Sequence, residues 1–393
     1  MQRDIVLCHA VRTAIGGFNG GLREVPATTL GATVIRAVME HSGLASDAID
    51  GVVMGQVVQA GSGMNPARQA AIHGGLDVSI PAMTVNRVCG SGAQAIVSAA
   101  QDILSGQGNI MVAGGMENMD RAPYLVSNGR WGYRMGHAQI YDSMLLDGLH
   151  DAFSQKHSGW HTEDLIAQHN VDREAQDRWA LRSQQRFVAA RDAGRFDAEI
   201  VPVEVPSRRG TEIFDRDEAP RPDTTLEGLA RLKPAFRDNG SITAGNAPGL
   251  NSGACAMLVA DRAAAEARGL VPMARLAGFA VTAVEPGMFG IAPVSAVKLA
   301  VQRAGWNLAD VDRVEINEAY AAIAIIVAGE LGLDEARVNV EGGAVAHGHP
   351  IGATGAMLAT RLMHAMRREG LRRGVVTLCI GGGQGIALAL EAL

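Results

Sequence analysis

The chain has 393 residues, with 35 Lys or Arg against 41 Asp or Glu, so its formal net charge is −6. A protein that binds nucleic acid needs a basic face, and this balance argues against one. Hydrophobic residues make up 47% of the chain, which is enough for a large core, and the length favours two or three domains. The composition therefore indicates a folded protein of several domains that does not bind nucleic acid.

The cysteine spacing and the lengths of the apolar runs indicate the cellular compartment in which the protein is expected. The four cysteines stand far apart, which fits neither a disulfide framework nor a Cys-x-x-Cys metal site and suits a reducing compartment. No apolar run approaches the ~20 residues that a membrane span needs, so we expect no membrane segment. The first residues lead directly into a strand-like stretch without a leader pattern, and we expect a cytoplasmic protein.

The first third of the chain alternates short apolar runs with Ala-rich stretches. Predicted strands are 49–55, 83–86 and 109–115, and predicted helices begin at Pro66 and span 91–104. Strands and helices that alternate in this way form β-α-β units. The pattern therefore predicts an α/β protein with a largely parallel sheet.

The middle of the chain, roughly 120–249, has a different character. Its charge density rises, and Trp, Tyr and Pro residues gather there. The pattern predicts one clear helix at 172–194 and otherwise long loops. A long stretch with little regular structure inside a compact protein is usually functional, so we interpret this segment as an insertion that covers a site.

The final third returns to alternating elements. Predicted strands are 311–316 and 374–380, and predicted helices are 319–331 and 352–366. Two helix starts resemble each other, because residues 89–93 read Cys-Gly-Ser-Gly-Ala and residues 352–356 read Gly-Ala-Thr-Gly-Ala. This weak internal repeat suggests two similar halves.

Cys89 lies at the predicted start of the helix 91–104. Unpaired backbone N–H groups and the helix dipole lower the pKa of a thiol at such a place and favour the nucleophilic thiolate. Small neighbours would let a substrate approach. A buried structural cysteine is the more common alternative.

Three further motifs lie at strand ends or helix starts. His347 and His349 stand in a Gly-rich turn, where an imidazole can activate a nucleophile or bond to backbone carbonyls, and the spacing of other ligands argues against a metal site. Cys379 precedes glycines 381–383, whose N–H groups could hold an anion, although a buried thiol at a tight turn is the simpler alternative. Asn317 could cap a helix or hold a catalytic water.

Taken together, these motifs resemble those of the thiolase family, in order and over the whole length of the chain. The pattern around the acylated cysteine is present at residues 86–92, which read Asn-Arg-Val-Cys-Gly-Ser-Gly. The Asn-Glu-Ala-Phe motif appears at residues 317–320 with Tyr320 in the last position, the Gly-His-Pro motif at 348–350, and the C-terminal cysteine motif at 379–383.

This resemblance implies an α/β protein with the thiolase fold. In that fold two similar βαβαβαββ halves form a layered α-β-α-β-α core, and a loop domain is inserted. By position, the N-terminal half would be 1–119, completed by 250–270, and the C-terminal half would be 271–393. The loop domain, 120–249, would cover the active site and bind coenzyme A.

The resemblance also implies acyl transfer to and from coenzyme A, which is substrate and product, with no separate cofactor and no metal. Cys89 would take the acyl group as a thioester, and His349 would activate it. Cys379 would remove the α-proton of acetyl-CoA, and a thiol suits this task because its pKa can be tuned near working pH. Asn317 would hold a water that forms one oxyanion site with His349, and the N–H groups of Cys89 and Gly381 would form the second.

Contacts with coenzyme A are implied mainly for the loop domain. The residues are Leu149, His157, Arg221, Phe236, Ala244, Leu250 and Tyr320. Three positions depart from the short-chain pattern: Ser158 and Phe289 each stand where a Met is usual, and Pro248 stands where a Ser would bind the pantetheine arm. These departures leave the preferred acyl chain length open.

We therefore expect an acyltransferase that interconverts two acetyl-CoA with acetoacetyl-CoA and CoA through a ping-pong cysteine acyl-enzyme. One alternative is a longer-chain 3-ketoacyl-CoA thiolase of fatty-acid or aromatic degradation. The other is a non-catalytic relative that binds acyl-CoA or lipid. The expected partners are acyl-CoA and CoA, without nucleic acid or membrane, and the expected assembly is a homotetramer or homodimer.

Overall fold

The computed structural model describes residues 3–207 and 210–393. Within these residues the main feature is an 11-stranded mixed sheet, whose main path runs β13-β14-β15-β12-β1-β11-β5-β3-β4. The N-terminal half supplies β1 (Ile5–Thr13), β3 (Gly51–Gly55), β4 (Ala82–Val85), β5 (Ile110–Asn118) and β11 (Asn251–Asp261). The C-terminal half supplies β12 (Pro272–Ala283), β13 (Arg313–Ile316), β14 (Arg373–Ile380) and β15 (Gln384–Glu391).

The two halves repeat one topology. In the N-terminal half the strand order from the edge is β4-β3-β5-β11-β1, and in the C-terminal half β13-β14-β15-β12 follows the same path. The counterpart of β4 is reduced to a parallel bridge between Val314 and Val338. β1 pairs antiparallel with both β11 and β12, which joins the halves. The prediction of two similar α/β halves is confirmed.

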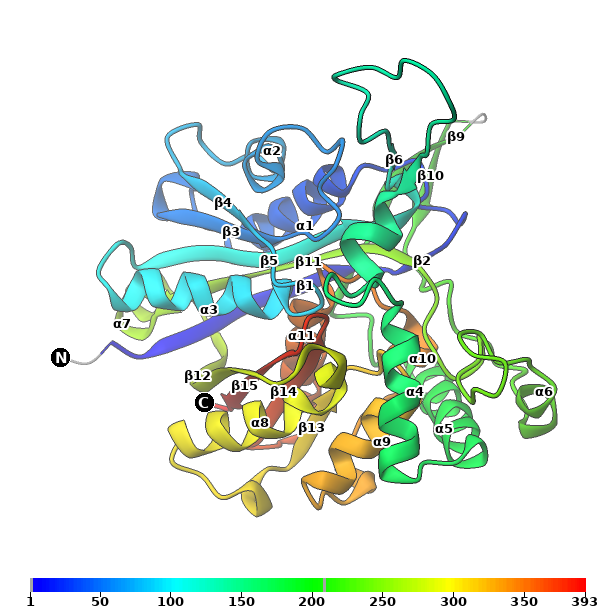
Figure 1. The fold of residues 1–393 in the computed structure, drawn as a ribbon. Helices are drawn as coiled ribbons and strands as arrows, with labels where there is room; N and C mark the ends of the chain where they lie inside the picture. Colours follow the sequence, from blue (N-terminus) through cyan, green and yellow to red (C-terminus); the bar gives the residue numbers. More distant parts are fainter. Residues whose placement is uncertain (1–2, 208–209) are drawn as a thin grey trace.

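Helices separate and cover the two parts of the sheet. α1 (Ala27–Ser42) and α2 (Pro66–His73) pack on the outer face of the N-terminal half. α8 (Ala292–Arg303) and α9 (Ala321–Glu330) pack on the outer face of the C-terminal half. α3 (Ser91–Leu104) and α11 (Thr354–Glu369) share one core with strands of both halves, so they form the middle layer. Figure 1 shows the resulting α-β-α-β-α order, with the N-terminal half above and the C-terminal half below.

The first turns of α3 and α11 lie in close contact because both contain glycine. A Cβ placed on Gly92 would lie 2.7 Å from the backbone nitrogen of Ala356, and one on Gly355 would lie 2.5 Å from that of Ala93. Only glycine permits this approach of two backbones. As a result, Cys89 before α3 and His349 before α11 come from opposite halves to one place.

The segment 120–249 contains more regular structure than its sequence predicts. α5 (Arg173–Asp192) agrees with the predicted helix, but α4 (Ser158–His169) and α6 (Leu226–Ala230) were expected to be loops. α4 buries few large apolar side chains and begins after His157 rather than a Ser, Thr, Asp or Asn cap, so its pattern is weak. The short strands are β6 (Tyr124–Leu125), β7 (Tyr141–Asp142), β8 (Ile200–Val201), β9 (Val203–Ser207) and β10 (Gly210–Phe214).

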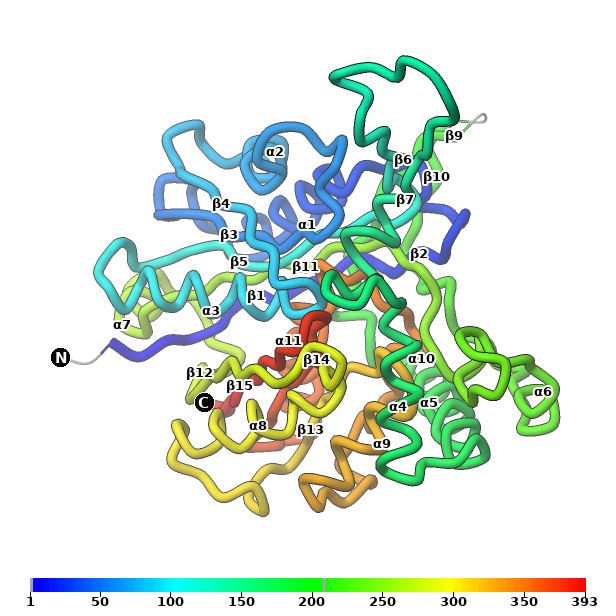
Figure 2. Tube along the Cα trace, viewed as in Figure 1, coloured from blue at the N-terminus to red at the C-terminus, as the bar shows by residue number. Residues whose placement is uncertain are grey.

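This segment is attached along one side of the molecule. α4 and α5 pack against α9, and α6 packs on α5 (Figure 1). The loop between β6 and β7 extends away from the core (Figure 2). Two buried ion pairs fix the segment to β1, because Arg12 bonds to Glu199 and to Asp217, each at 2.8 Å.

The remaining regular elements are short. β2 (Gly16–Gly17) pairs with β11, and the two short α-helices are α7 (Arg262–Ala267) and α10 (Ala344–His347). A π-helical turn spans Met144–Leu149, and 3₁₀-helical turns span Ser46–Ala48, Met119–Arg121, Pro286–Ile291, Leu308–Asp310 and Glu335–Arg337. None of the helices in the described ranges has the length and apolar character that crossing a bilayer requires.

Candidate active site

Cys89 is presented by a strained turn directly before α3. The preceding residue, Val88, has φ of 45°, a left-handed conformation that a β-branched side chain rarely adopts. Two polar side chains hold the turn: Asn86 Oδ1 accepts a hydrogen bond from the Val88 nitrogen at 2.9 Å, and Ser91 Oγ donates to the Val88 oxygen at 2.7 Å. The strain is therefore built into the segment that aims the Cys89 sulfur.

The electrostatics of Cys89 differ from the expectation for a helix start. Burial raises the pKa of the thiol to about 11, although hydrogen bonds from the backbone N–H groups of Gly381 and Cys89 itself oppose this rise. The expectation of a lowered pKa is wrong, because removal from water outweighs the few donors at the turn. The same two N–H groups are those predicted for an oxyanion site, and both face the Cys89 sulfur.

The tautomer of His349 follows from its neighbours. Thr354 Oγ1 donates its proton to the oxygen of Pro350 at 2.8 Å, so it must accept from His349 Nδ1, which lies 2.7 Å away. Nδ1 therefore carries the proton, and Nε2 keeps its lone pair. Burial lowers the pKa of His349 to about 4, so the ring is neutral near pH 7 and can accept a proton at Nε2.

Asn317 joins this arrangement from the end of β13. Its Nδ2 lies 3.3 Å from His349 Nε2, and its Oδ1 has no hydrogen-bond partner among the described residues. Asn317 is fully buried and does not cap α9, whose cap position is Tyr320. The helix-cap interpretation of Asn317 is thus wrong, and its amide faces the imidazole.

Cys379 is the next-to-last residue of β14 and has 1% of its surface exposed. Burial raises its pKa well above the ordinary value, and the charge of Cys89 raises it further. The two sulfurs, one from each half, therefore interact electrostatically in one site. A pKa tuned near working pH was expected for Cys379, and this expectation is also wrong, because removal from water and the charge of Cys89 both disfavour its thiolate.

Two buried carboxylates hold the motifs together, and neither is among the site residues predicted from the sequence. Glu117 accepts from the backbone nitrogens of Val57, Val58 and Gly352, which ties the Gly-His-Pro turn to the N-terminal half. Glu318 accepts from four groups, which are Trp179 Nε1, Ser183 Oγ, Asn339 Nδ2 and the Val345 nitrogen. Glu318 lies inside the recognised motif, so its position in that motif was the available signal.

The site opens into a cavity of about 380 Å³. Cys89, His349 and Gly381 line it, whereas Cys379 and Asn317 are buried outside its lining. Of the residues implied to contact coenzyme A, the structure places five on the cavity wall: Leu149, His157, Phe236, Leu250 and Tyr320.

The other two implied contact residues lie outside the cavity lining. Arg221 and Ala244 are exposed neighbours, with a hydrogen bond of 3.3 Å from the guanidinium to the Ala244 oxygen. The three positions that depart from the short-chain pattern, Ser158, Pro248 and Phe289, all line the cavity.

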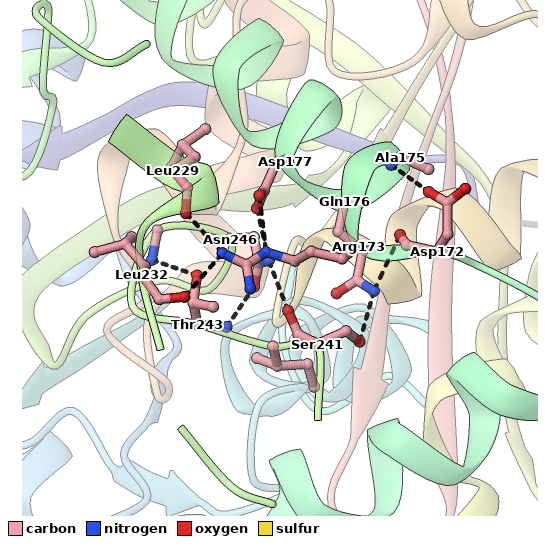
Figure 3. Close-up of polar contacts among 12 residues, drawn as sticks. Asp172, Arg173, Ala175, Gln176, Asp177, Leu229, Leu232, Ser241, Thr243 and Asn246 are labelled. Carbon is pink, nitrogen blue, oxygen red and sulfur yellow. Dashed lines mark hydrogen bonds and ion pairs between the residues drawn. The ribbon is translucent and has the colours of Figure 1, made fainter. Parts of the chain in front are cut away.

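The loop that leads to Pro248 is anchored between α5 and α9. Asn246 Nδ2 donates to Asp177 Oδ1 at 3.0 Å, and Arg173 Nε donates to the other oxygen of that carboxylate at 2.8 Å (Figure 3). The backbone oxygen of Asn246 accepts a hydrogen bond from the backbone nitrogen of Ala321 at the start of α9. These contacts fix the wall of the cavity near Tyr320.

The two neighbouring imidazoles have different surroundings. His349 contacts Asn317 and Thr354, whereas the His347 ring lies 5.8 Å from that of Phe187. Both ring nitrogens of His347 are buried without a partner among the described residues. Those residues also contain no group of three or more His, Cys, Asp or Glu side chains arranged to hold a metal ion.

Comparison with known proteins identifies the family. The model of the thiolase N-terminal domain matches residues 5–263, and the model of the thiolase C-terminal domain matches residues 270–392. The chain belongs to the thiolase family.

Full-length relatives carry related names. An acetyl-CoA acetyltransferase of Pseudomonas aeruginosa is 52% identical over 99% of both chains, and one of Escherichia coli K12 is 48% identical over the whole of both. A probable acetyl-CoA acyltransferase of Staphylococcus epidermidis is 50% identical over 98% of both. The crystal structure of the Bacillus anthracis acetyl-CoA acetyltransferase matches with a TM-score of 0.98 and 41% identity, over 100% of this chain and 99% of that one.

Proposed function

We propose that the protein catalyses reversible acetyl transfer between coenzyme A thioesters, in which two acetyl-CoA give acetoacetyl-CoA and CoA. The observation that carries this proposal is that Cys89 and the neutral imidazole of His349 line one cavity, and that Cys379, from the opposite half, interacts electrostatically with Cys89. Two thiols suit the reaction because one holds the acyl group while the other moves the proton. The names of the full-length relatives agree with it.

In the first half-reaction His349 Nε2 accepts the Cys89 proton as the sulfur attacks the thioester carbonyl. A resting thiol with a pKa of about 11 needs this acceptor, because little thiolate exists at neutral pH. The N–H groups of Cys89 and Gly381 bind the oxyanion that forms. The bond between the carbonyl carbon and the CoA sulfur then breaks, the Cys379 thiol gives its proton to the departing sulfur, and the acyl group is left on Cys89 as a thioester. The Cys379 thiolate is then the base that takes the α-proton of the second acetyl-CoA.

Cys379 is a proton donor in the cleavage direction. When the carbon–carbon bond of the 3-ketoacyl substrate breaks, its electrons pass to the enolate of acetyl-CoA, and the Cys379 thiol protonates the α-carbon. The thiolate then takes the proton of the incoming CoA thiol, whose sulfur attacks the acyl-enzyme, and His349 returns its proton to Cys89. A raised pKa suits this role, because it makes the thiolate a strong base for the reverse step.

The enolate needs stabilisation as it forms. His349 and a water held by Asn317 supply it in our proposal, and removing one such donor typically costs about a hundredfold in rate. The free Oδ1 of Asn317 supports this role, since it can accept a hydrogen bond from the water. The deep site limits competition from bulk water.

Coenzyme A would bind along the cavity wall. Leu149, His157, Phe236, Leu250 and Tyr320 are proposed to contact the pantetheine arm and the acyl group. Arg221 and Ala244 are exposed outside the cavity and are proposed for the adenine and phosphate end, where a guanidinium fits phosphate. No separate cofactor or metal enters this mechanism.

Assembly, compartment and pathway remain predictions. We expect a homotetramer or homodimer, a cytoplasmic location and a role in fatty acid metabolism. The division into 1–119 with 250–270, 120–249 and 271–393 is likewise a proposal. Sedimentation velocity on the purified chain measures the assembly.

The test of the mechanism is mass spectrometry together with isotope exchange. After mixing with acetyl-CoA, the protein should gain one acetyl group, on Cys89. Cys379→Ser should still be acylated but should lose deuterium uptake into the acetyl methyl group. Cys255→Ser, at a buried cysteine of β11 that packs in the core of the middle layer, is the matched control and should retain both. If Cys379→Ser exchanged deuterium normally, the proposed acid/base would be wrong.

The departures at Ser158, Pro248 and Phe289 support a second candidate, a longer-chain 3-ketoacyl-CoA thiolase, because all three line the cavity. Relative kcat/KM values for thiolysis across a chain-length series decide between the two. Binding of coenzyme A without any thiolysis would instead indicate a non-catalytic relative.

A further inference from the structure

The cavity wall near the two thiols carries a pair of hydroxyl groups. Ser158 Oγ and Tyr320 Oη lie 2.8 Å apart, and both residues line the cavity. Ser158 is the first residue of α4, and Tyr320 directly precedes α9, so the pair depends on the packing of the two helices. Phe236 meets the Tyr320 ring edge-on at 5.9 Å and helps to fix it.

The pair lies on the acyl side of the cavity. Ser158 and Tyr320 line the same cavity as Cys89, and the Tyr320 hydroxyl interacts electrostatically with Cys89 and with Cys379. In the motif pattern described above, Phe is usual at position 320 and Met at position 158, so neither hydroxyl is required by the chemistry of the two cysteines. The hydroxyls are a feature of this chain at the place where the acyl group is held.

The hydrogen bonding of the pair leaves one proton free. One hydroxyl donates to the other, and the second has no further acceptor among the described contacts. Tyr320 has 6% of its surface exposed. An alkyl chain against this wall would leave a buried donor unsatisfied, which is unfavourable, whereas an acceptor oxygen would satisfy it.

The charges around the cavity indicate which kind of acceptor oxygen an acyl chain could place beside this hydroxyl pair. Its described lining contains no Lys or Arg, and it includes the carboxylates of Asp147 and Asp151. Burial lowers the pKa of His157 and of His349 to about 4, so both are neutral near pH 7. His150 and His161 also line the cavity, and His161 Nε2 is hydrogen-bonded to Ser154 Oγ at 2.7 Å. With no Lys or Arg in the described lining to pair with it, a carboxylate on the acyl chain is disfavoured, and a neutral ether, keto or hydroxyl oxygen is favoured.

We propose that Ser158 and Tyr320 determine specificity, and that they select 3-ketoacyl-CoA substrates whose transferred acyl chain carries a neutral acceptor oxygen. This inference rests on the proposed function, because it assumes that Cys89 takes the acyl chain. The pantetheine arm also contains acceptor oxygens, and the experiment separates the two sources.

The experiment compares thiolysis of 3-ketooctanoyl-CoA with that of three analogues in which an ether oxygen replaces carbon 5, 6 or 7. The quantity measured is the ratio of kcat/KM for each analogue to kcat/KM for the parent, so changes common to all substrates cancel. We expect Tyr320→Phe and Ser158→Ala to lower this ratio about three- to tenfold at one oxygen position, the size of one neutral hydrogen bond.

Two control variants separate the hydroxyls from the shape of the cavity. Ser158→Thr keeps a hydroxyl and should keep the wild-type ratio. Phe289→Met changes the volume of the wall without removing a hydroxyl, and should change parent and analogues alike.

The contrary outcomes are distinct. Equal ratios in all variants at every oxygen position overturn the inference. An equal loss of kcat/KM with all CoA substrates would assign the hydroxyls to the pantetheine arm and would also overturn the inference. Cleavage of acetoacetyl-CoA without cleavage of any substrate with an eight-atom chain would overturn it as well. Failure of the wild-type protein to cleave acetoacetyl-CoA and 3-ketooctanoyl-CoA would count against the proposed function itself.

Discussion

Asn317 Nδ2 lies 3.3 Å from His349 Nε2, although one residue follows a strand and the other precedes a helix. The imidazole is held in this orientation from its other side by Thr354. The Thr354 hydroxyl donates its proton to the Pro350 oxygen, so it can only accept from His349 Nδ1. This contact forces the Nδ1–H tautomer of His349 and directs the Nε2 lone pair toward the site. Thr354 is thus a positioning residue for the proposed base.

Thr354→Val should lower kcat for acetoacetyl-CoA thiolysis by about tenfold to hundredfold, because it removes the acceptor that selects the tautomer of a general base. KM should change less, since Thr354 does not line the cavity. Steady-state kinetics measures both constants. Thr354→Ser restores the hydroxyl and should recover most of the rate, and a Ser variant as slow as the Val variant would contradict the tautomer argument.

The pKa of Cys89 gives a second prediction. Burial raises it to about 11, so the thiolate fraction should increase tenfold with each pH unit across the neutral and mildly alkaline range. In a Cys379→Ser background, alkylation of Cys89 by iodoacetamide should rise in that way without a plateau near pH 8.5, where an ordinary thiol levels off. The unfolded protein is the control. A plateau near pH 7 in the folded protein would show a stabilised thiolate instead.

The sequence predicted the positions of the reacting residues better than it predicted the pKa values of their side chains. The four motifs mark Cys89, Asn317, His349 and Cys379 because each stands at a strand end or helix start, a local feature. The pKa of Cys89 could not be predicted locally. The helix start suggested a lowered value, but the burial that dominates comes from residues far away in the chain.

The middle segment shows the same limit. α5 was predicted because its cap, Asp172, and its length are visible in the sequence, whereas α4 depends on packing against α9. Arg12 has two buried partners, Glu199 and Asp217, which are distant from it in sequence and share no pattern with it. The Ser158–Tyr320 contact likewise joins positions 162 residues apart, so only the fold shows it.

His347 leads to a prediction about stability and pH. Neither buried ring nitrogen has a hydrogen-bond partner of good geometry among the described residues. Burial, with Arg361 and Arg12 adding to it, lowers the His347 pKa well below the ordinary value, and a backbone contact with Gly348 opposes this only in part. A His with a lowered folded pKa binds a proton more readily in the unfolded chain, so it destabilises the fold increasingly as pH falls below about 6.5. His347→Leu, similar in size, should remove this penalty.

We expect His347→Leu to raise the free energy of unfolding by about 1–2 kcal/mol near pH 7.5, the cost of an unsatisfied buried polar group. The gain should be larger at pH 5.5, since the wild-type protein must keep the imidazole neutral there. Urea unfolding at the two pH values measures both. A gain that shrinks toward low pH would mean that the folded protein protonates His347 readily.

The contact between the first turns of α3 and α11 gives the last prediction. A Cβ on Gly92 would lie 2.7 Å from the Ala356 nitrogen and 2.9 Å from the Ala353 oxygen, and backbone atoms cannot move aside cheaply. Gly92→Ala should therefore destabilise the protein by about 1–3 kcal/mol through overpacking. It should also lower acylation of Cys89, because the helix starts that carry the two halves of the site would be forced apart.

Gly329→Ala is the matched control, at a glycine near the end of another helix. Gly329 lies in α9, and a Cβ there would have no atom within 4 Å. Removing the backbone freedom of glycine from a helix should stabilise the protein by about 0.5–1 kcal/mol and leave acylation unchanged. Thermal unfolding and acetyl incorporation are measured on both variants. A loss of stability in Gly92→Ala with normal acetyl incorporation would show that the site does not depend on the helix contact. Parallel loss of stability and acylation in Gly92→Ala alone is the outcome that the close packing predicts.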